Sequence, residues 1–493
     1  MKKRKAHSFS AAGCFIRRAL HSFADVYLQD MQQPSHPPYR PLLLMLLVLL
    51  LLCGVSALPE ELVKKAGFKP LRLLSDLKPE NRYRHRGKIN LRSDPSQKTG
   101  ESGTVASLLQ PEGDTLLFSF DPVKHALESF FMALEKKKKV RIAYFGDSMI
   151  EGDLITQTIR ELYQKKYGGA GVGMMPLTSA VAGFRQSISH VFSDNWRENN
   201  ILANSPKGRE PGITGHVFFP PAGSDSLASG EAIASYRCAK GFGNSPFHRA
   251  RVILSGRQSG AGVALKHGNE YTQKQAQKSG RLEALDFDVE GESGPLQFRF
   301  SAGDYPVYGI SFEADSGVYV DNLGFRGNSG LPMSRIPASL LQQFDSLLSY
   351  DLVILHYGIN AVSAEVEDYS WYSRGLMRTL LHFRKAMPGT PILLIGTADK
   401  GYNSEEGYIT DPGVPRVVEA QKKAAHQSQT AFLDLFQLMG GEGTMVRWVE
   451  SDRPLANKDY THLNFSGASK IGKMIFDCLE EEKKRYIIKK ENI

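Results

Sequence analysis

Short apolar runs alternate with helix-forming segments in this chain, and this alternation limits its fold more than any other feature. The apolar runs cover residues 140–145, 352–356, 391–396 and 431–436, and the helical segments cover 154–167, 371–387, 414–427 and 467–486. An earlier segment, 121–139, also has apolar residues at helical spacing. Strands that alternate with helices predict a parallel sheet with helices on both faces, which is an α/β fold.

The middle of the chain has a different pattern, with no long helical segment between His190 and Ser316. Apolar and polar residues alternate over 285–289 and 296–300, a further apolar run covers 251–254, and clusters of Gly and Ser separate these runs. This pattern predicts an antiparallel β-sandwich inserted into the α/β domain. We therefore expect residues 121–189 and 317–486 to form the two parts of one α/β domain around an insert at 190–316.

The N-terminal region begins with a targeting segment. Residues 42–52 are almost entirely Leu, a basic stretch precedes them, and small residues follow up to Ala57. This order predicts a signal peptide within residues 1–58, and so an exported, periplasmic or cell-envelope protein. An uncleaved membrane anchor and a lipoprotein at Cys53 are the alternatives. Residues 59–120 form a polar region, in which 78–103 has the composition of a linker.

Charge and cysteine content exclude several classes of function. The formal net charge is +9, and more than half of it lies in residues 1–58. No basic stripe is interleaved with aromatic residues, so we expect no nucleic-acid partner. Cys238 and Cys478 remain after the predicted cleavage, either as a disulfide or as two separate thiols. No Cys or His cluster has the spacing of a metal site, and we expect neither a metal nor a cofactor.

Polar residues suited to acyl transfer follow the predicted strands. Gly146, Asp147 and Ser148 come directly after the run 140–145, where the chain turns into a helix. Reacting groups gather at the carboxyl ends of parallel strands, and the backbone N–H of Ser148 can point at an oxyanion there. Asp459 and His462 are three residues apart, so one turn can hold both and the carboxylate can orient the imidazole.

Two further strand ends offer oxyanion donors. Asn360 follows the strand 352–356 and carries an amide that can donate a hydrogen bond. A glycine-containing segment, 322–327, follows the predicted strand 318–323, and a glycine there permits close approach of a backbone N–H to a substrate. Each signal is weak alone, but all four occur in order at the ends of predicted strands.

These four segments resemble blocks I, II, III and V of the SGNH (GDSL-like) hydrolase family. The resemblance implies a flavodoxin-like three-layer α/β domain in which Ser148 is the nucleophile, His462 the general base and Asp459 the third member of the triad. It also implies an oxyanion hole made by Gly327, Asn360 and the N–H of Ser148, with Gly324 as the alternative to Gly327.

A narrower resemblance rests on residues 146–153 and 167–173. These segments are similar to bacterial envelope SGNH proteins related to peptidoglycan O-acetylesterases, which carry a carbohydrate-binding-like β domain inserted between blocks I and II. The resemblance covers about residues 121–485. Met149 departs from it, since such esterases often have His or Gln at that position, and this leaves the substrate open.

The resemblance implies an esterase that removes O-acetyl groups from a cell-envelope polysaccharide or peptidoglycan through an acyl-serine. One alternative is an O-acetyltransferase that passes the acyl group to a sugar hydroxyl, with a membrane-bound O-acyltransferase as its partner. Hydrolysis and transfer need the same triad, so the sequence does not separate them. The other alternative is a non-catalytic carbohydrate-binding protein, and the intact set of Ser148, Asn360, Asp459 and His462 argues against it.

Overall fold

The computed structural model describes residues 117–118, 126–222, 230–239, 247–256, 261–267, 269–289 and 294–491. The predicted signal peptide or anchor within 1–58 lies outside these residues, as does the polar region up to residue 116. No helix in the described part of the chain is long and apolar enough to span a membrane.

The sheet of the α/β domain is parallel in its main part, as the sequence predicts. In spatial order its strands are β14 (Gly317–Gly324), β2 (Lys139–Gly146), β15 (Leu352–His356), β16 (Ile392–Ile395) and β19 (Ala431–Leu433). Numbered along the chain, this is the order 2-1-3-4-5 of flavodoxin-like folds. The short strand β1 (Leu117–Phe118) pairs antiparallel with β19 at one edge. The order reverses at β2, so the crevice between β2 and β15 is where such folds place their ligands.

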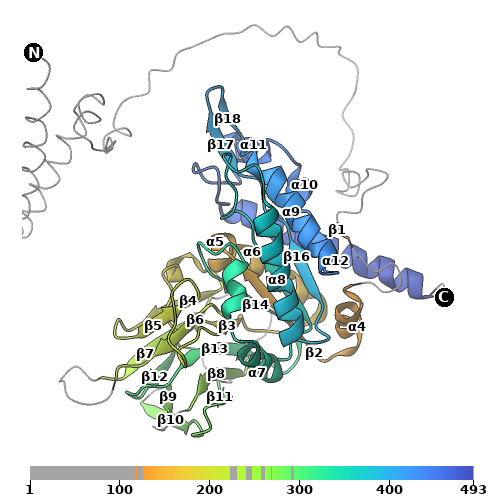
Figure 1. The fold of residues 1–493 in the computed structure, drawn as a ribbon. Helices are drawn as coiled ribbons and strands as arrows, with labels where there is room; N and C mark the ends of the chain where they lie inside the picture. Colours follow the sequence, from red (N-terminus) through yellow and green to blue (C-terminus); the bar gives the residue numbers. More distant parts are fainter. Residues whose placement is uncertain are drawn as a thin grey trace, which may run out of the picture. The chain divides into compact units, whose positions relative to one another are not determined.

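Helices cover both faces of this sheet and give three layers (Figure 1). Side chains alternate along a strand, so Ile142 and Tyr144 of β2 pack into one core while Ala143 and Phe145 pack into the other. The first core includes α4 (Glu128–Lys136), α6 (Leu154–Tyr167) and α12 (Phe465–Glu491), and the second includes α7 (Ala338–Leu348), α8 (Ser370–Ala386) and α9 (Gly413–Gln427). The predicted flavodoxin-like three-layer domain is thus confirmed.

The middle of the chain forms two antiparallel sheets that pack face to face. One sheet has the order β10 (Glu270–Gln275), β9 (Gly262–His267), β12 (Leu296–Phe300), β7 (Ala232–Cys238) and β4 (Ile188–Phe192). The other has the order β11 (Leu282–Asp288), β8 (Arg249–Ser255), β13 (Val307–Glu313), β6 (His216–Phe219) and β5 (Arg197–Asn200), with β3 (Gly173–Met175) paired to β13.

Both sheets of this sandwich contribute to one buried core, in which Phe298 of the first sheet lies near Phe287 and Phe312 of the second. The predicted inserted antiparallel β-sandwich is confirmed as a fold class. Its division from the α/β domain at 190 and 316 stays a prediction. The strand β3 and the first residues of β4 precede residue 190.

A buried arginine joins the two parts. Arg141 of β2 is 1% exposed, and its Nε donates to Asp321 of β14 at 2.8 Å while its Nη1 donates to Glu313 of β13 at 2.6 Å. Burial raises the pKa of Glu313, but the positive charges of Arg141 and Lys139 outweigh this effect and leave the pKa well below its ordinary value. The sandwich is therefore fixed to strand β2 of the parallel sheet by a buried, charge-assisted contact.

Several elements differ from the sequence prediction. The strand expected over 431–436 ends at Leu433, because the side chain of Asp434 caps α10 (Leu435–Met439) by accepting from the N–H of Gln437. The helix expected over 121–139 is α4, which covers only Glu128–Lys136. The unpredicted elements are α5 (Ser148–Glu151), α11 (Thr444–Glu450), the 3₁₀ turns at Ala182–Phe184 and Leu331–Arg335, α7, and a hairpin of β17 (Gly401–Ser404) and β18 (Gly407–Thr410).

Candidate active site

Ser148 lies at the carboxyl end of β2, where the strand turns sharply into α5. The turn needs glycine at position 146, because a Cβ there would lie 2.2 Å from Cγ1 of Ile150. The carboxylate of Asp147 caps α5 by accepting from the N–H of Met149 at 3.0 Å. Ser148 is the first residue of this helix, so its own N–H is among those that no intrahelical bond uses.

A chain of hydrogen bonds runs from Ser148 to Asp459. The Oγ of Ser148 lies 2.9 Å from Nε2 of His462, and Nδ1 of His462 lies 2.8 Å from Oδ2 of Asp459. A carboxylate only accepts, so Nδ1 carries the hydrogen and Nε2 is left to accept from the serine hydroxyl. The three residues that the sequence proposed as a triad therefore lie together with the geometry of a base-activated hydroxyl.

Asp459 uses its second oxygen to shape the turn that carries the histidine. Its Oδ1 accepts from the N–H groups of Thr461, at 3.0 Å, and His462, at 2.9 Å. Burial raises the pKa of Asp459, but these bonds and the imidazole outweigh it and leave the pKa below its ordinary value. The carboxylate stays ionised at neutral pH and can hold the imidazole in one tautomer.

The two predicted oxyanion donors lie beside the serine turn. Asn360 is exposed after β15, and its Nδ2 donates to the backbone oxygen of Asn328 at 3.2 Å. Burial raises the pKa of Asp147 to about 7, and a hydrogen bond from the amide of Asn360 is among the contacts that oppose this rise. Gly327, next to Asn328, is exposed and has φ of +68°, which favours glycine. These contacts connect Asn360 both with the turn after β14 and with the residue before Ser148.

Gly324, the alternative to Gly327, lies in a packed position. A Cβ at Gly324 would stand 2.4 Å from the backbone nitrogen of Glu151, so this glycine allows the end of β14 to pack against α5. Gly327 is the exposed one of the two. The packing therefore favours Gly327 as the glycine with an accessible N–H, and its role in an oxyanion hole stays a prediction.

A hairpin that the sequence analysis missed supports the histidine turn. Tyr460, between Asp459 and His462, has φ of +53°, and its ring stacks on Tyr408 of β18 with centroids 3.6 Å apart. The N–H of Gly401 in β17 donates to the backbone oxygen of Tyr460 at 2.7 Å. The turn residues Ser404 and Gly407 on either side of Glu405 and Glu406 were the local signal available for this hairpin.

In the described ranges, no group of three His, Cys, Asp or Glu residues could hold a metal ion. Cys238 and Cys478 are separate thiols, not a disulfide.

The sequence matches a family model over residues 291–469, that of the GDSL-like Lipase/Acylhydrolase family. The chain carries a GDSL-like acylhydrolase domain. The matched segment contains Gly327, Asn360, Asp459 and His462, while Ser148 lies before it, since the inserted sandwich separates the serine turn from the other site residues. This match supports an ester-bond hydrolase of the SGNH/GDSL type.

One solved structure with substantial coverage shares the fold. A peptidoglycan O-acetylesterase matches with a TM-score of 0.61 and 20% identity, over 75% of this chain and 99% of that chain. An acetyl xylan esterase matches with a TM-score of 0.25 and 18% identity, over 32% of this chain and 79% of that chain. Only the first carries weight for the fold. No curated protein matches the chain.

Proposed function

We propose that this GDSL-like acylhydrolase is an exported serine esterase that removes O-acetyl groups from a cell-envelope polysaccharide or peptidoglycan. The proposal rests above all on the hydrogen-bond chain from the Oγ of Ser148 through His462 to Asp459. Export rests on the apolar run and small residues within 1–58. The likeness to a peptidoglycan O-acetylesterase fold motivates the choice of substrate.

In the proposed mechanism, Oγ of Ser148 attacks the acetyl carbonyl carbon while Nε2 of His462 takes the hydroxyl proton. Negative charge develops on the carbonyl oxygen, which Asn360 and the N–H groups of Ser148 and Gly327 stabilise. The tetrahedral intermediate collapses, and the sugar oxygen leaves with the proton from His462. Water, deprotonated by His462, then attacks the acetyl-serine, and acetate and free Ser148 are released.

The transferase reading changes only the second half of this reaction. A sugar hydroxyl replaces water as the acceptor, and a membrane-bound O-acyltransferase would supply the acyl group. The exposed side chains of Asp459 and His462 leave room on that side for either acceptor. We favour hydrolysis because the family match is to an acylhydrolase.

The test measures the products formed from O-acetylated peptidoglycan and from an O-acetylated neutral polysaccharide. We expect free acetate from the wild type, none from Ser148→Ala, and unchanged release from Ser346→Ala, a matched substitution at an exposed position on α7. Acetylated acceptor sugars in place of acetate would identify a transferase. Absence of both products on every acetylated glycan would contradict the proposed substrate class.

A further inference from the structure

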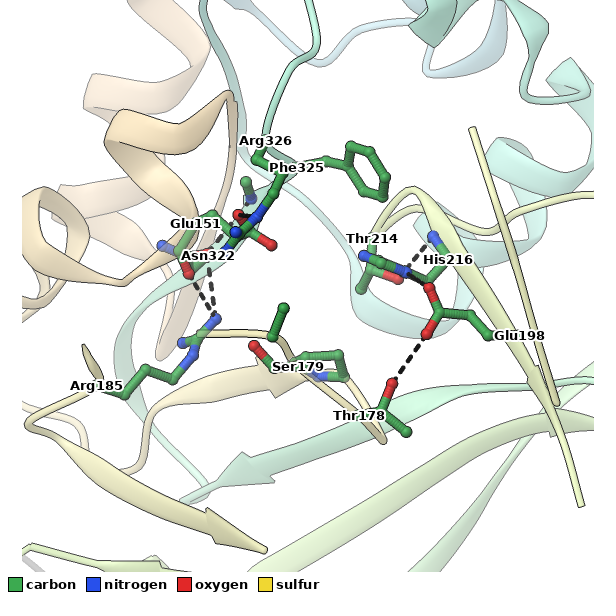
Figure 2. Close-up of a pocket in the computed structure, with 13 residues that line it drawn as sticks. Glu151, Thr178, Ser179, Arg185, Glu198, Thr214, His216, Asn322, Phe325 and Arg326 are labelled. Atoms are coloured by element: carbon green, nitrogen blue, oxygen red, sulfur yellow. Dashed lines mark hydrogen bonds and ion pairs between the residues drawn. The ribbon is translucent and has the colours of Figure 1, made fainter. Parts of the chain in front are cut away.

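A cavity of about 140 Å³ lies beside the serine turn, between α5, the turn after β14 and the sandwich (Figure 2). Glu151, which lines it, belongs to the same short helix as Ser148 and is one turn further along. Phe325 and Arg326 line it from the segment that leads to Gly327. The cavity therefore adjoins the proposed reaction centre, but no proposed catalytic residue lines it.

Most charged groups around this cavity already have partners. Nε of Arg326 donates to Glu151 at 2.7 Å. On the sandwich side, Glu198 accepts from Thr178 at 2.9 Å and lies 2.6 Å from Nδ1 of His216. Burial raises the pKa of Glu198, but the contacts with His216 and Thr178 lower it below its ordinary value. The carboxylates of Glu151 and Glu198 therefore already have hydrogen-bond partners within the protein.

Arg185 is the exception. This side chain is 3% exposed, and its Nη2 makes two long bonds of 3.3 Å to neutral acceptors, the backbone oxygen of Glu151 and Oδ1 of Asn322. Its Nε is buried and has no hydrogen-bond partner. Figure 2 shows its guanidinium at one wall of the cavity, facing Glu151 and Asn322. Burial lowers the pKa of Arg185, as expected for a cation that lacks a full counter-charge.

The carboxylate of Asp153, which lies close to Arg185, already has other hydrogen-bond donors. Asp153 accepts two hydrogen bonds from Arg160, at 3.0 and 2.7 Å, and one from Ser187 at 2.8 Å. It lies 3.8 Å from Nη1 of Arg185, beyond hydrogen-bond distance. A buried guanidinium normally pairs with a carboxylate through bidentate bonds, and Arg185 forms no such pair in the part of the chain that the structure describes.

We propose that this cavity is a subsite for a sugar unit that carries a carboxylate, next to the acetylated unit of the glycan. The carboxylate would receive hydrogen bonds from Arg185, while Thr178, Ser179 and the Glu198–His216 pair would bind the hydroxyl groups. Phe325 would pack against the ring. The subsite rests on the proposed glycan substrate, and its test uses binding, so that it does not depend on turnover.

The test measures affinity by calorimetry for two unacetylated probes. One is a disaccharide of glucuronic acid and N-acetylglucosamine, and the other is the same disaccharide with its carboxyl group reduced to an alcohol. With the full chain, we expect the acidic probe to bind on the order of tenfold more tightly than the reduced one. Equal affinity for the two probes would overturn the proposal.

A set of charge variants separates a ligand-binding arginine from a structural one. Arg185→Gln should abolish the preference for the acidic probe, and Arg185→Lys should keep part of it. Arg326→Gln leaves Glu151 unpaired at the cavity and should weaken binding of the acidic probe. Glu198→Gln removes a negative charge and should strengthen it. Lys473→Gln, which changes a charge on the exposed side of α12, should alter neither affinity.

Arg326 and Glu198 are partly exposed, so their variants keep the test decisive if Arg185→Gln fails to fold. Affinities for the acidic probe that do not follow the order of charge, with Glu198→Gln tightest and Arg326→Gln weakest, would contradict the subsite. If the wild type releases no acetate from acetylated glycans, that result contradicts only the proposed function. The two failures are therefore distinguishable.

Discussion

The two halves of the hydrogen-bond chain are held in different ways. Ser148 follows a strand that is buried almost throughout, and Asp147 before it is 2% exposed. The side chains of His462 and Asp459 are 41% and 50% exposed, on a turn after the last strand of the sheet. The nucleophile is thus placed by core packing, whereas the base depends on a few local contacts: the carboxylate of Asp459 and the stack of Tyr460 on Tyr408.

The largest effect should come from the buried half. Ser148→Ala removes the nucleophile without changing the packing of β2, so we expect esterase activity to fall by about 10⁴-fold or more while the thermal unfolding midpoint stays the same. Initial rates on a chromogenic acetyl ester check this. An activity near the wild-type level would remove Ser148 from the mechanism.

Substitutions in the exposed half, at His462 and Asp459, should lower activity nearly as much as Ser148→Ala if both halves take part in the same proton transfer. His462→Gln should approach the loss of Ser148→Ala, and the double variant should be little worse than either single one, because the two side chains share one proton transfer. Asp459→Asn should also lower kcat steeply, since an amide can favour the wrong tautomer. Additive losses in the double variant, measured as kcat/KM, would show that the residues act separately.

Asn360 tests whether the crevice between β2 and β15 holds the oxyanion. Asn360→Ala should lower kcat by about 10²–10³-fold, the usual cost of one oxyanion donor, with KM little changed. Steady-state kinetics on the same acetyl ester measure both constants. A rise in KM alone would make Asn360 a residue that binds the ground-state substrate.

The hairpin should matter less, through the position of the base. Tyr408→Ala removes the ring that stacks on Tyr460, and we expect kcat to fall by about tenfold because His462 is held less firmly. Tyr408→Phe keeps the ring and should restore the rate. Tyr402→Ala, on the opposite face of the same hairpin, is the control and should have no effect. Equal losses at Tyr402 and Tyr408 would mean that the hairpin acts as a whole and not through the stack.

The last expected effect is on stability and not on rate, and it concerns the buried half. Burial raises the pKa of Asp147 to about 7, against the opposing contributions of Met149 N–H, His462 and Asn360. A raised carboxyl pKa contributes stability at low pH that is lost as pH rises through about 7. Asp147→Asn lacks this ionisation, so its stability relative to wild type should rise by about 3 kcal/mol between pH 5 and pH 8. Denaturant unfolding at both pH values measures it, and a constant difference would contradict the raised pKa.

The same contrast explains what the sequence could predict. Carboxyl ends of parallel strands converge on one edge, so the local patterns around Ser148, Asn360 and His462 were enough to bring them together. The hairpin that supports His462 has short strands of mostly exposed residues, which leave little periodic signal. The cavity depends on pairing between distant residues, such as Arg326 with Glu151, and on the bidentate pair of Arg160 with Asp153. No local pattern reveals that Arg185 has only the more distant contact with Asp153, at 3.8 Å.

In the proposed mechanism the acyl group passes through Ser148. Mass spectrometry of peptides from protein quenched during turnover of an O-acetylated glycan can detect this intermediate. We expect an acetyl group on Ser148 in the wild type, and none on any serine in His462→Gln. Continued acetate release without acetylation of Ser148 would contradict it.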